Sequence, residues 1–156
     1  EMTSSLVGSE MCIRDRWGHA EAYLSRIRQH GAVTAFDCSD RPEDPAAQTA
    51  LPGTDIVFFS DDGSDDETLL RRLQALTAAG PRIAVATRGA RGSMAYDGQR
   101  FYEQGIIPCQ VVDTMGAGDS FIAGFLHGYL EGLDIPACMT AGAQCSAVTL
   151  SYEGAW

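Results

Sequence analysis

The residues best suited to chemistry lie in one stretch, 113–126, where an apolar segment runs into two closely spaced glycines and an aspartate. Gly116 and Gly118 allow the backbone to turn sharply, so that several N–H groups can point to one place. Those groups, with the positive end of the following helix dipole, would bind an anion such as a phosphate. Asp119 would repel that anion. A carboxylate at this position is explained if it takes the proton from an attacking hydroxyl. The stretch therefore indicates phosphoryl transfer, with Asp119 as base and the amides of Gly116, Ala117 and Gly118 as an anion hole.

Two other interpretations of this stretch stay open on the residues alone. An aspartate near the start of a helix is often simply a helix cap. If that is the whole role of Asp119, it takes no part in the chemistry. A dinucleotide-binding fingerprint also needs closely spaced glycines, but its third glycine would fall at Phe121. Residues 113–115 also separate the strand from the turn, which that fingerprint does not allow.

A series of alternating strands and helices would position residues 113–126. Short apolar runs predict strands at 33–36, 56–59, 83–87, 94–96, 100–102 and 106–112. Apolar residues at helical spacing predict helices at 20–27, 68–79, 120–130 and 136–150, and a proline-rich segment at 42–52 leaves room for one short helix. Asp97-Gly98 predicts a hairpin turn. The pattern indicates an α/β fold with a mainly parallel sheet flanked by helices.

The composition narrows the class of protein. The chain has 156 residues, 45% of them hydrophobic, which suffices for the core of one modest domain. Its 21 acidic and 11 basic residues give a net charge of −10, which argues against a nucleic-acid or anionic-membrane surface. All the basic residues are arginine, and the absence of lysine excludes a Walker P-loop and Schiff-base chemistry. The five cysteines form no Cys-x-x-Cys pair, which favours a reduced, cytoplasmic setting.

The first sixteen residues fit none of this pattern. They show neither strand nor helix periodicity, and they lack the basic start and apolar stretch of a signal peptide. Residues 5–16 resemble the translated read-through of a sequencing adapter. We therefore expect a non-native leader at 1–16, a domain at 17–156, and a natural protein that begins upstream of Trp17.

Two motifs together resemble those of the ribokinase/pfkB-type carbohydrate kinases. The second signature of that family is matched at every fixed position by Asp113-Thr114-x-Gly116-Ala117-Gly118-Asp119 and the later Ala123-Gly124-Phe125-Leu126. Thr87-x-Gly89-x-x-Gly92 has the form of the family's turn along the nucleotide phosphates, although alone it would be a plain hairpin connection. The resemblance implies the C-terminal, nucleotide-binding half of a ribokinase-like fold, with the lid and most sugar contacts in an N-terminal half that is missing here.

The family resemblance also implies cofactors. ATP would lie along Thr87, Gly89 and Gly92, with Mg²⁺ required by the reaction, and Asp113 would hold a monovalent cation or position the turn. The family's Asn-x-x-Glu motif, which organises magnesium-bound water, is replaced by Ser60-Asp61-Asp62-Gly63. Asp61 or Asp62 would have to serve instead. The wider acidic cluster at 61–67 is interpreted as the charged first turn of a helix, with a metal site as the alternative.

A narrower resemblance concerns the substrate. The segments 17–21, 34–40 and 154–156 resemble the members of the family that phosphorylate O6 of a fructosamine such as fructoselysine. The alternatives are a kinase for another sugar or a nucleoside, or a truncated, non-catalytic fragment that binds nucleotide. We expect a cytoplasmic enzyme that acts on a small molecule, with no nucleic-acid or membrane partner. A homodimer is one expectation for the full-length protein, and this chain alone is expected to be inactive.

Overall fold

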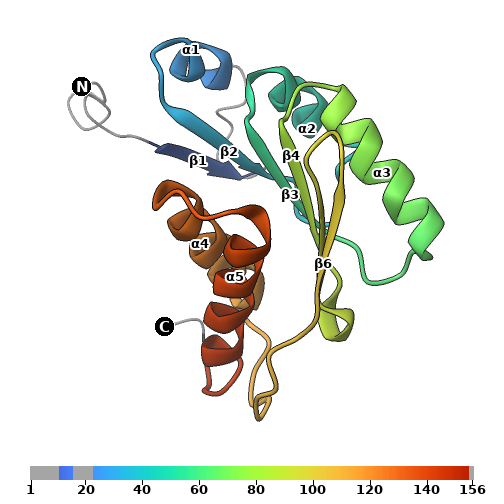
Figure 1. Cartoon of the computed structure of the whole chain (residues 1–156), viewed down its shortest axis with the longest axis vertical. Helices are drawn as coiled ribbons and strands as arrows, with labels where there is room; N and C mark the ends of the chain where they lie inside the picture. Colours follow the sequence, from blue (N-terminus) through green and yellow to red (C-terminus); the bar gives the residue numbers. More distant parts are fainter. Residues whose placement is uncertain (1–10, 16–22, 155–156) are drawn as a thin grey trace. The chain divides into compact units, whose positions relative to one another are not determined.

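A computed structural model describes residues 11–15 and 23–154 of the chain. Their strands form one sheet in the order β1-β2-β3-β4-β5-β6, with neighbours in the sequence also neighbours in the sheet (Figure 1). The strands are β1 Met11–Asp15, β2 Val33–Asp37, β3 Ile56–Ser60, β4 Ile83–Thr87, β5 Ser93–Tyr96 and β6 Phe101–Gln104. The strands β1, β2 and β3 pair in parallel, with Ala35 opposite Ile56. The short connections on either side of β5 require antiparallel neighbours, so the sheet is mixed.

The α-helices are α1 Leu24–Gln29, α2 Pro45–Ala50, α3 Asp66–Ala78, α4 Ala117–Leu130 and α5 Ile135–Thr149. Two 3₁₀ turns follow α2 and β4, namely η2 Leu51–Gly53 and η3 Gly89–Arg91. None of the helices in the described ranges is long and apolar enough to cross a membrane.

The described chain divides into two compact units. The first holds the described residues up to Ser60 together with Ser64–Val85 and Tyr96–Arg100. Its core is formed by near-continuous apolar strands such as Ile56–Phe59, each side chain of which is at most 2% exposed. Helix α3 adds Leu69, Leu73 and Leu76, which recur at helical spacing on its buried face.

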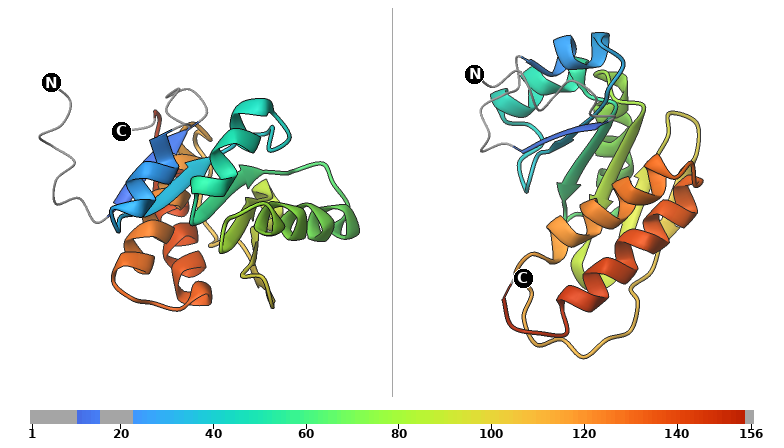
Figure 2. Two further views of the ribbon diagram at one scale, coloured as in Figure 1. Left: turned by 90° about the horizontal axis from the view of Figure 1, so that it is seen from above. Right: turned by 90° about the vertical axis from the view of Figure 1, so that its left-hand side faces the viewer.

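The second unit comprises Asp61–Gly63, Ala86–Ala95 and the described residues from Phe101 onward. Helices α4 and α5 lie side by side in it, as the right-hand view of Figure 2 shows. Two glycines allow the close approach: a methyl group added at Gly124 would lie 2.7 Å from the Ala141 carbonyl oxygen, and one at Gly142 would lie 2.8 Å from the Phe121 carbonyl oxygen. The turn at 116–118, predicted to bind an anion and called the anion turn below, lies at the start of α4.

The α/β class, the strands β2 to β4, the hairpin and the helices α2, α3 and α5 agree with the sequence prediction. The predicted strand at 106–112 is wrong. That segment has no regular structure and lies exposed, with Ile106 and Val111 56% and 60% accessible to solvent. The sheet order ends at β6, so none of the described strands pairs with the segment, and Pro108 lacks the N–H that a strand needs.

Two element boundaries also differ from the prediction. Helix α4 begins at Ala117, three residues before the predicted start, so that Gly118 and Asp119 belong to its first turn. Strand β1 lies inside the segment interpreted as a leader, where the sequence pattern indicates no strand, and that interpretation of 1–16 stays a prediction. Residues 1–10, the predicted helix start at 20–22 and the segments 17–21 and 155–156 lie outside the described residues.

Candidate active site

The turn that enters α4 leaves its first amides open. Gly116 is the N-cap residue with φ = 75°, a left-handed conformation that favours glycine, and no described side chain caps the helix. The Ala117 N–H has only a long contact, 3.4 Å, to the Thr114 carbonyl oxygen. Within the described ranges, the N–H groups of Gly118 and Asp119 have no acceptor. A methyl group added at Gly118 would meet nothing within 4 Å, so this turn borders open space that an anion can enter.

Asp119 occupies the third position of α4 and its side chain is exposed. It makes no capping hydrogen bond, and no hydrogen bond or ion pair to it is formed by the described residues. A carboxylate in the first turn still interacts favourably with the helix dipole. The arrangement leaves both carboxylate oxygens available for a substrate proton, and it gives little support to the interpretation of Asp119 as a cap.

Asp113 is held very differently. Its Oδ1 accepts the Met115 N–H at 3.1 Å and its Oδ2 accepts the Gly154 N–H at 3.0 Å. These N–H groups favour the ionised form and lower the pKa of Asp113 below its ordinary value. The preceding Val112 N–H donates to the Leu150 carbonyl oxygen at 2.7 Å. Asp113 therefore ties the anion turn to the chain that follows α5.

Two hydroxyl contacts join α5 to the start of α4. Ser146 Oγ donates to the Ala117 carbonyl oxygen at 2.6 Å, and Ser120 Oγ lies 2.6 Å from Oγ1 of the buried Thr149. The pattern of small residues in α5 predicts close packing, but it does not reveal which hydroxyl contacts which group. These contacts were therefore missed by sequence analysis.

The second predicted motif forms the connection between β4 and β5. Thr87 ends β4, the turn η3 follows, and the Arg88 N–H donates to the Gly92 carbonyl oxygen at 2.8 Å. Gly92 has φ = 82°, and a Cβ there would overlap the Gln104 carbonyl. Only glycine fits this position, which is true both of a phosphate-binding turn and of a plain hairpin connection.

Two arginines inside the same motif were also missed. The buried Arg88 donates to the Arg91 carbonyl oxygen at 2.9 Å and forms an ion pair with Glu103 on β6. Arg91 donates to the carbonyl oxygens of Asp61 and Asp62 at 3.3 and 3.0 Å. The signal available in the sequence is two arginines within a tight glycine turn. Their effect is to fix the turn and to hold the loop after β3 against it.

The loop after β3 contains a candidate ligand for the magnesium ion that the reaction implies. A methyl group added at Gly89 would lie 3.1 Å from Oδ1 of Asp62, so this carboxylate lies beside the predicted triphosphate turn. The described part of the chain has no cluster of three or more histidine, cysteine or acidic residues suited to a metal. A single carboxylate is nevertheless a suitable donor set for Mg²⁺, which usually binds one or two carboxylates together with substrate phosphates. Asp62 fits that requirement.

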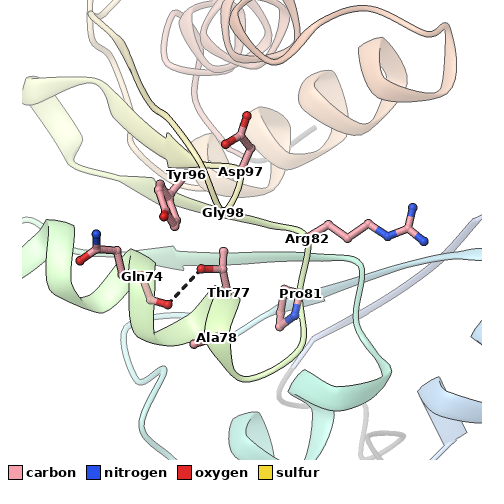
Figure 3. Close-up of a pocket in the computed structure, with 8 residues that line it drawn as sticks. All are labelled: Gln74, Thr77, Ala78, Pro81, Arg82, Tyr96, Asp97 and Gly98. Carbon is pink, nitrogen blue, oxygen red and sulfur yellow. Dashed lines mark hydrogen bonds between the residues drawn. The ribbon is translucent and has the colours of Figure 1, made fainter.

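All the predicted site residues lie in the second unit. Helix α5 contacts the start of α4 through Ser146. It also reaches the neighbourhood of Gly92, because Thr140 Oγ1 donates to Oε1 of Gln104 at 2.9 Å and the Gln104 carbonyl packs against Gly92. A separate shallow groove in the first unit, lined by residues such as Gln74, Arg82 and Tyr96, contains none of the predicted site residues (Figure 3).

Comparisons with known proteins agree with these motifs. A family model described as "pfkB family carbohydrate kinase" matches residues 19–156. The chain is 44% identical over 140 residues to fructoselysine 6-kinase of Escherichia coli, covering 90% of this chain and 53% of that protein. The chain thus spans about half the length of this curated relative.

Solved structures give the same fold. A microbiome-derived acarbose kinase superposes with a TM-score of 0.85 at 26% identity, over 97% of this chain and 52% of that one. A ribokinase of Arabidopsis thaliana, solved with ribose and ATP, has a TM-score of 0.83 at 21% identity, over 96% of this chain and 52% of that one.

Proposed function

Because the chain belongs to the pfkB family of carbohydrate kinases, we propose that the natural protein carrying it transfers the γ-phosphoryl group of ATP to a primary hydroxyl of a sugar or sugar amine. O6 of fructoselysine is the favoured acceptor, supported by the 44% identity to a fructoselysine 6-kinase. The observation that carries the proposal is the first turn of α4, where open amides adjoin the carboxylate of Asp119, which has no partner among the described residues. We place this enzyme in the cytoplasm, as its free cysteines favour.

In this mechanism Asp119 is the general base. Its carboxylate accepts the proton of the attacking hydroxyl, which makes the oxygen a better nucleophile as the bond to phosphorus forms. The amides of Gly116, Ala117 and Gly118 donate hydrogen bonds to the negative charge on the transferred group. Gly116 is fixed by the turn, and Ala117 and Gly118 are fixed by the first turn of α4, so these donors need little reorganisation during the reaction.

The nucleotide would lie along Thr87, Gly89 and Gly92. Asp62, whose carboxylate borders Gly89, is the residue that would hold Mg²⁺ there. Magnesium held there would neutralise part of the negative charge of the phosphates. The contacts of Arg91 with the Asp61 and Asp62 carbonyls keep that loop in place.

Asp113 is assigned the role of positioning the turn. Each of its oxygens already accepts a backbone N–H, which favours this role, and the monovalent cation stays a prediction. The homodimer likewise stays a prediction.

A second candidate function is a kinase for a different sugar or a nucleoside. It is supported by the likeness to an acarbose kinase at 26% identity, since that name implies a substrate other than a fructosamine. The family resemblance implies that most sugar contacts lie outside this chain, which leaves the choice of sugar open to both candidates.

The test is a substrate panel with the purified natural protein, ATP and Mg²⁺. Fructoselysine, ribose, acarbose and adenosine are supplied at equal concentration, and the phosphorylated position is determined by ³¹P–¹H NMR. We expect phosphorylation at O6 of fructoselysine with the highest kcat/KM. A higher value for another acceptor would establish the second candidate, and turnover of none would contradict both.

A further inference from the structure

The hydroxyl of Ser146 contacts the peptide group whose N–H faces the open space before α4. Ser146 Oγ donates to the Ala117 carbonyl oxygen at 2.6 Å. The carbonyl of Ala117 and the N–H of Gly118 belong to one planar peptide unit. The Ser146 hydroxyl therefore binds the carbonyl end of this peptide unit. The N–H end, at Gly118, has no acceptor in the described chain.

A hydrogen bond to one end of a peptide unit changes the other end. A donor at the carbonyl oxygen draws electron density from the amide nitrogen and makes its N–H a stronger donor, because hydrogen bonds in a chain polarise one another. The same contact fixes the plane of the peptide unit and so the direction of the N–H. Both effects favour an anion in front of Gly118.

We propose that Ser146 is a positioning residue for phosphoryl transfer, acting by orienting and polarising the Ala117–Gly118 peptide unit. This inference rests on the proposed function, because it assigns the Gly118 N–H to the transferred phosphoryl group. Ser146 does not touch the substrate itself. We expect Ser146 to affect the rate of phosphoryl transfer, because the Gly118 N–H would contact the charged phosphoryl oxygens in the transition state. We expect it to affect sugar binding much less.

The chain provides a matched control in the neighbouring pair of hydroxyls. Ser120 and Thr149 join the same two helices with the same 2.6 Å separation of their oxygen atoms. The Ser120 N–H, however, already donates within the helix to the Gly116 carbonyl oxygen at 2.9 Å. Thr149→Val removes this second contact at nearly constant volume, and it leaves the Ala117–Gly118 unit unchanged.

The experiment compares Ser146→Ala, Ser146→Thr and Thr149→Val in the natural protein. Ser146→Ala should lower kcat about 3- to 10-fold, a fraction of the 10²–10³-fold that loss of a whole oxyanion-hole donor costs, with the KM for the sugar nearly unchanged. Ser146→Thr keeps the hydroxyl and should restore most of the rate. Thr149→Val should lower the melting temperature at least as much as Ser146→Ala, with kcat within about twofold of the parent value.

A second measurement does not depend on activity. With ¹⁵N-labelled glycine, the Gly118 amide nitrogen resonance should shift in Ser146→Ala and return toward its original position in Ser146→Thr, while Thr149→Val leaves it nearly in place. An unchanged Gly118 resonance, or equal losses of kcat in Ser146→Ala and Thr149→Val, would overturn the inference. If the parent protein transfers no phosphoryl group, the proposed function fails. The Gly118 resonance then still decides whether Ser146 polarises the peptide unit.

Discussion

At the scale of single residues, the two aspartates of the anion turn have opposite surroundings. Both oxygens of Asp113 accept backbone N–H groups, whereas Asp119 has no partner among the described residues. A carboxylate that holds a turn must keep its hydrogen bonds, and one that accepts a substrate proton must be free to do so. This difference supports a positioning role for Asp113 and a chemical role for Asp119.

The role of Asp119 is tested by Asp119→Asn in the natural protein. The variant keeps the size of the side chain but removes the base, so kcat should fall about 10²–10⁴-fold. The melting temperature should fall only slightly, because the described residues form no hydrogen bond with this carboxylate and only its interaction with the helix dipole is lost. ATP affinity should hold or rise slightly, since a negative charge near the phosphates is lost. Steady-state kinetics and thermal unfolding measure these effects.

Asp134→Asn is the matched control for that variant. Asp134 is the N-cap of α5 and accepts the Ala137 N–H at 3.0 Å, a role that asparagine fills about as well. Both kcat and melting temperature should therefore stay near the parent values. Near-normal turnover in Asp119→Asn would refute the assignment of the base.

Cysteine reactivity gives a second prediction at this scale. Burial, with the negative charges of Asp37 and Glu43, raises the pKa of Cys38 to about 12, whereas Cys109 and Cys145 are exposed. The thiolate is the reactive form, so at pH 8 iodoacetamide should label Cys109 and Cys145 and spare Cys38. Peptide mass spectrometry before and after unfolding in guanidinium checks this at each site. Rapid labelling of Cys38 in the native protein would show that it is not buried as described.

At the scale of elements, the sequence was informative where one local cause decides the structure. Runs such as Ile83–Thr87 predict strands because they are apolar throughout, and Gly116 marks the anion turn because its left-handed backbone favours glycine. The segment 106–112 was misassigned because its apolar residues have no strand to pair with, which only the sheet order reveals. Arg88 and Ser146 could not be identified, since their partners Glu103 and Ala117 are distant in sequence.

The start of α3 gives a prediction on pH. Oδ1 of Asp65 accepts the Thr68 N–H at 2.8 Å, and this hydrogen bond lowers the pKa of Asp65 below its ordinary value of 3.8. A carboxylate with a lowered pKa stabilises the fold above its ordinary pKa, and this contribution is lost as the pH falls through the folded-state value. Asp65→Ala should therefore lower the melting temperature at pH 7, with the difference shrinking toward pH 3.

Asp65→Asn separates the cap from the charge in that experiment. Asparagine still accepts the Thr68 N–H, so the melting temperature of this variant should lie close to the parent value at pH 7 and depend less on pH. Equal melting temperatures for the parent and Asp65→Ala at pH 7 would contradict the role of this cap.

The contact between α4 and α5 gives a prediction on packing. Gly124→Ala would place a methyl group 2.7 Å from the Ala141 carbonyl oxygen and 2.8 Å from Sγ of Cys145, so the helices must separate. Overpacking of this kind should lower the free energy of unfolding by about 1–3 kcal/mol. Gly118→Ala on the same helix meets nothing within 4 Å and should be neutral or gain up to about 1 kcal/mol from helix propensity. Urea unfolding of both variants measures the difference, and equal stabilities would contradict the close approach of α4 and α5.

At the scale of the whole molecule, the matched part of the chain spans 53% of the curated kinase it resembles. The second unit carries the proposed phosphoryl-transfer residues. The same unit exposes a run of apolar side chains just before the anion turn, with accessibilities of 50–63% at Ile106, Val111, Val112 and Met115. Apolar groups that gather in one exposed segment commonly mark a surface that another part of the protein covers.

The last prediction concerns this apolar segment, 106–115. The 156-residue chain produced alone should bind a hydrophobic dye such as ANS strongly, because these side chains lie open to water. Ile106→Ser combined with Val111→Ser should remove much of the fluorescence, whereas Leu130→Ser, at an exposed leucine outside the segment, should remove little. The natural protein should bind little dye and should phosphorylate its sugar, whereas the chain alone should be inactive, since its match covers only 53% of the fructoselysine 6-kinase. If the natural protein binds as much dye as the chain alone, no other part of the molecule covers the segment. Weak dye binding by a monomeric, cooperatively melting chain would instead indicate that the chain is stable on its own.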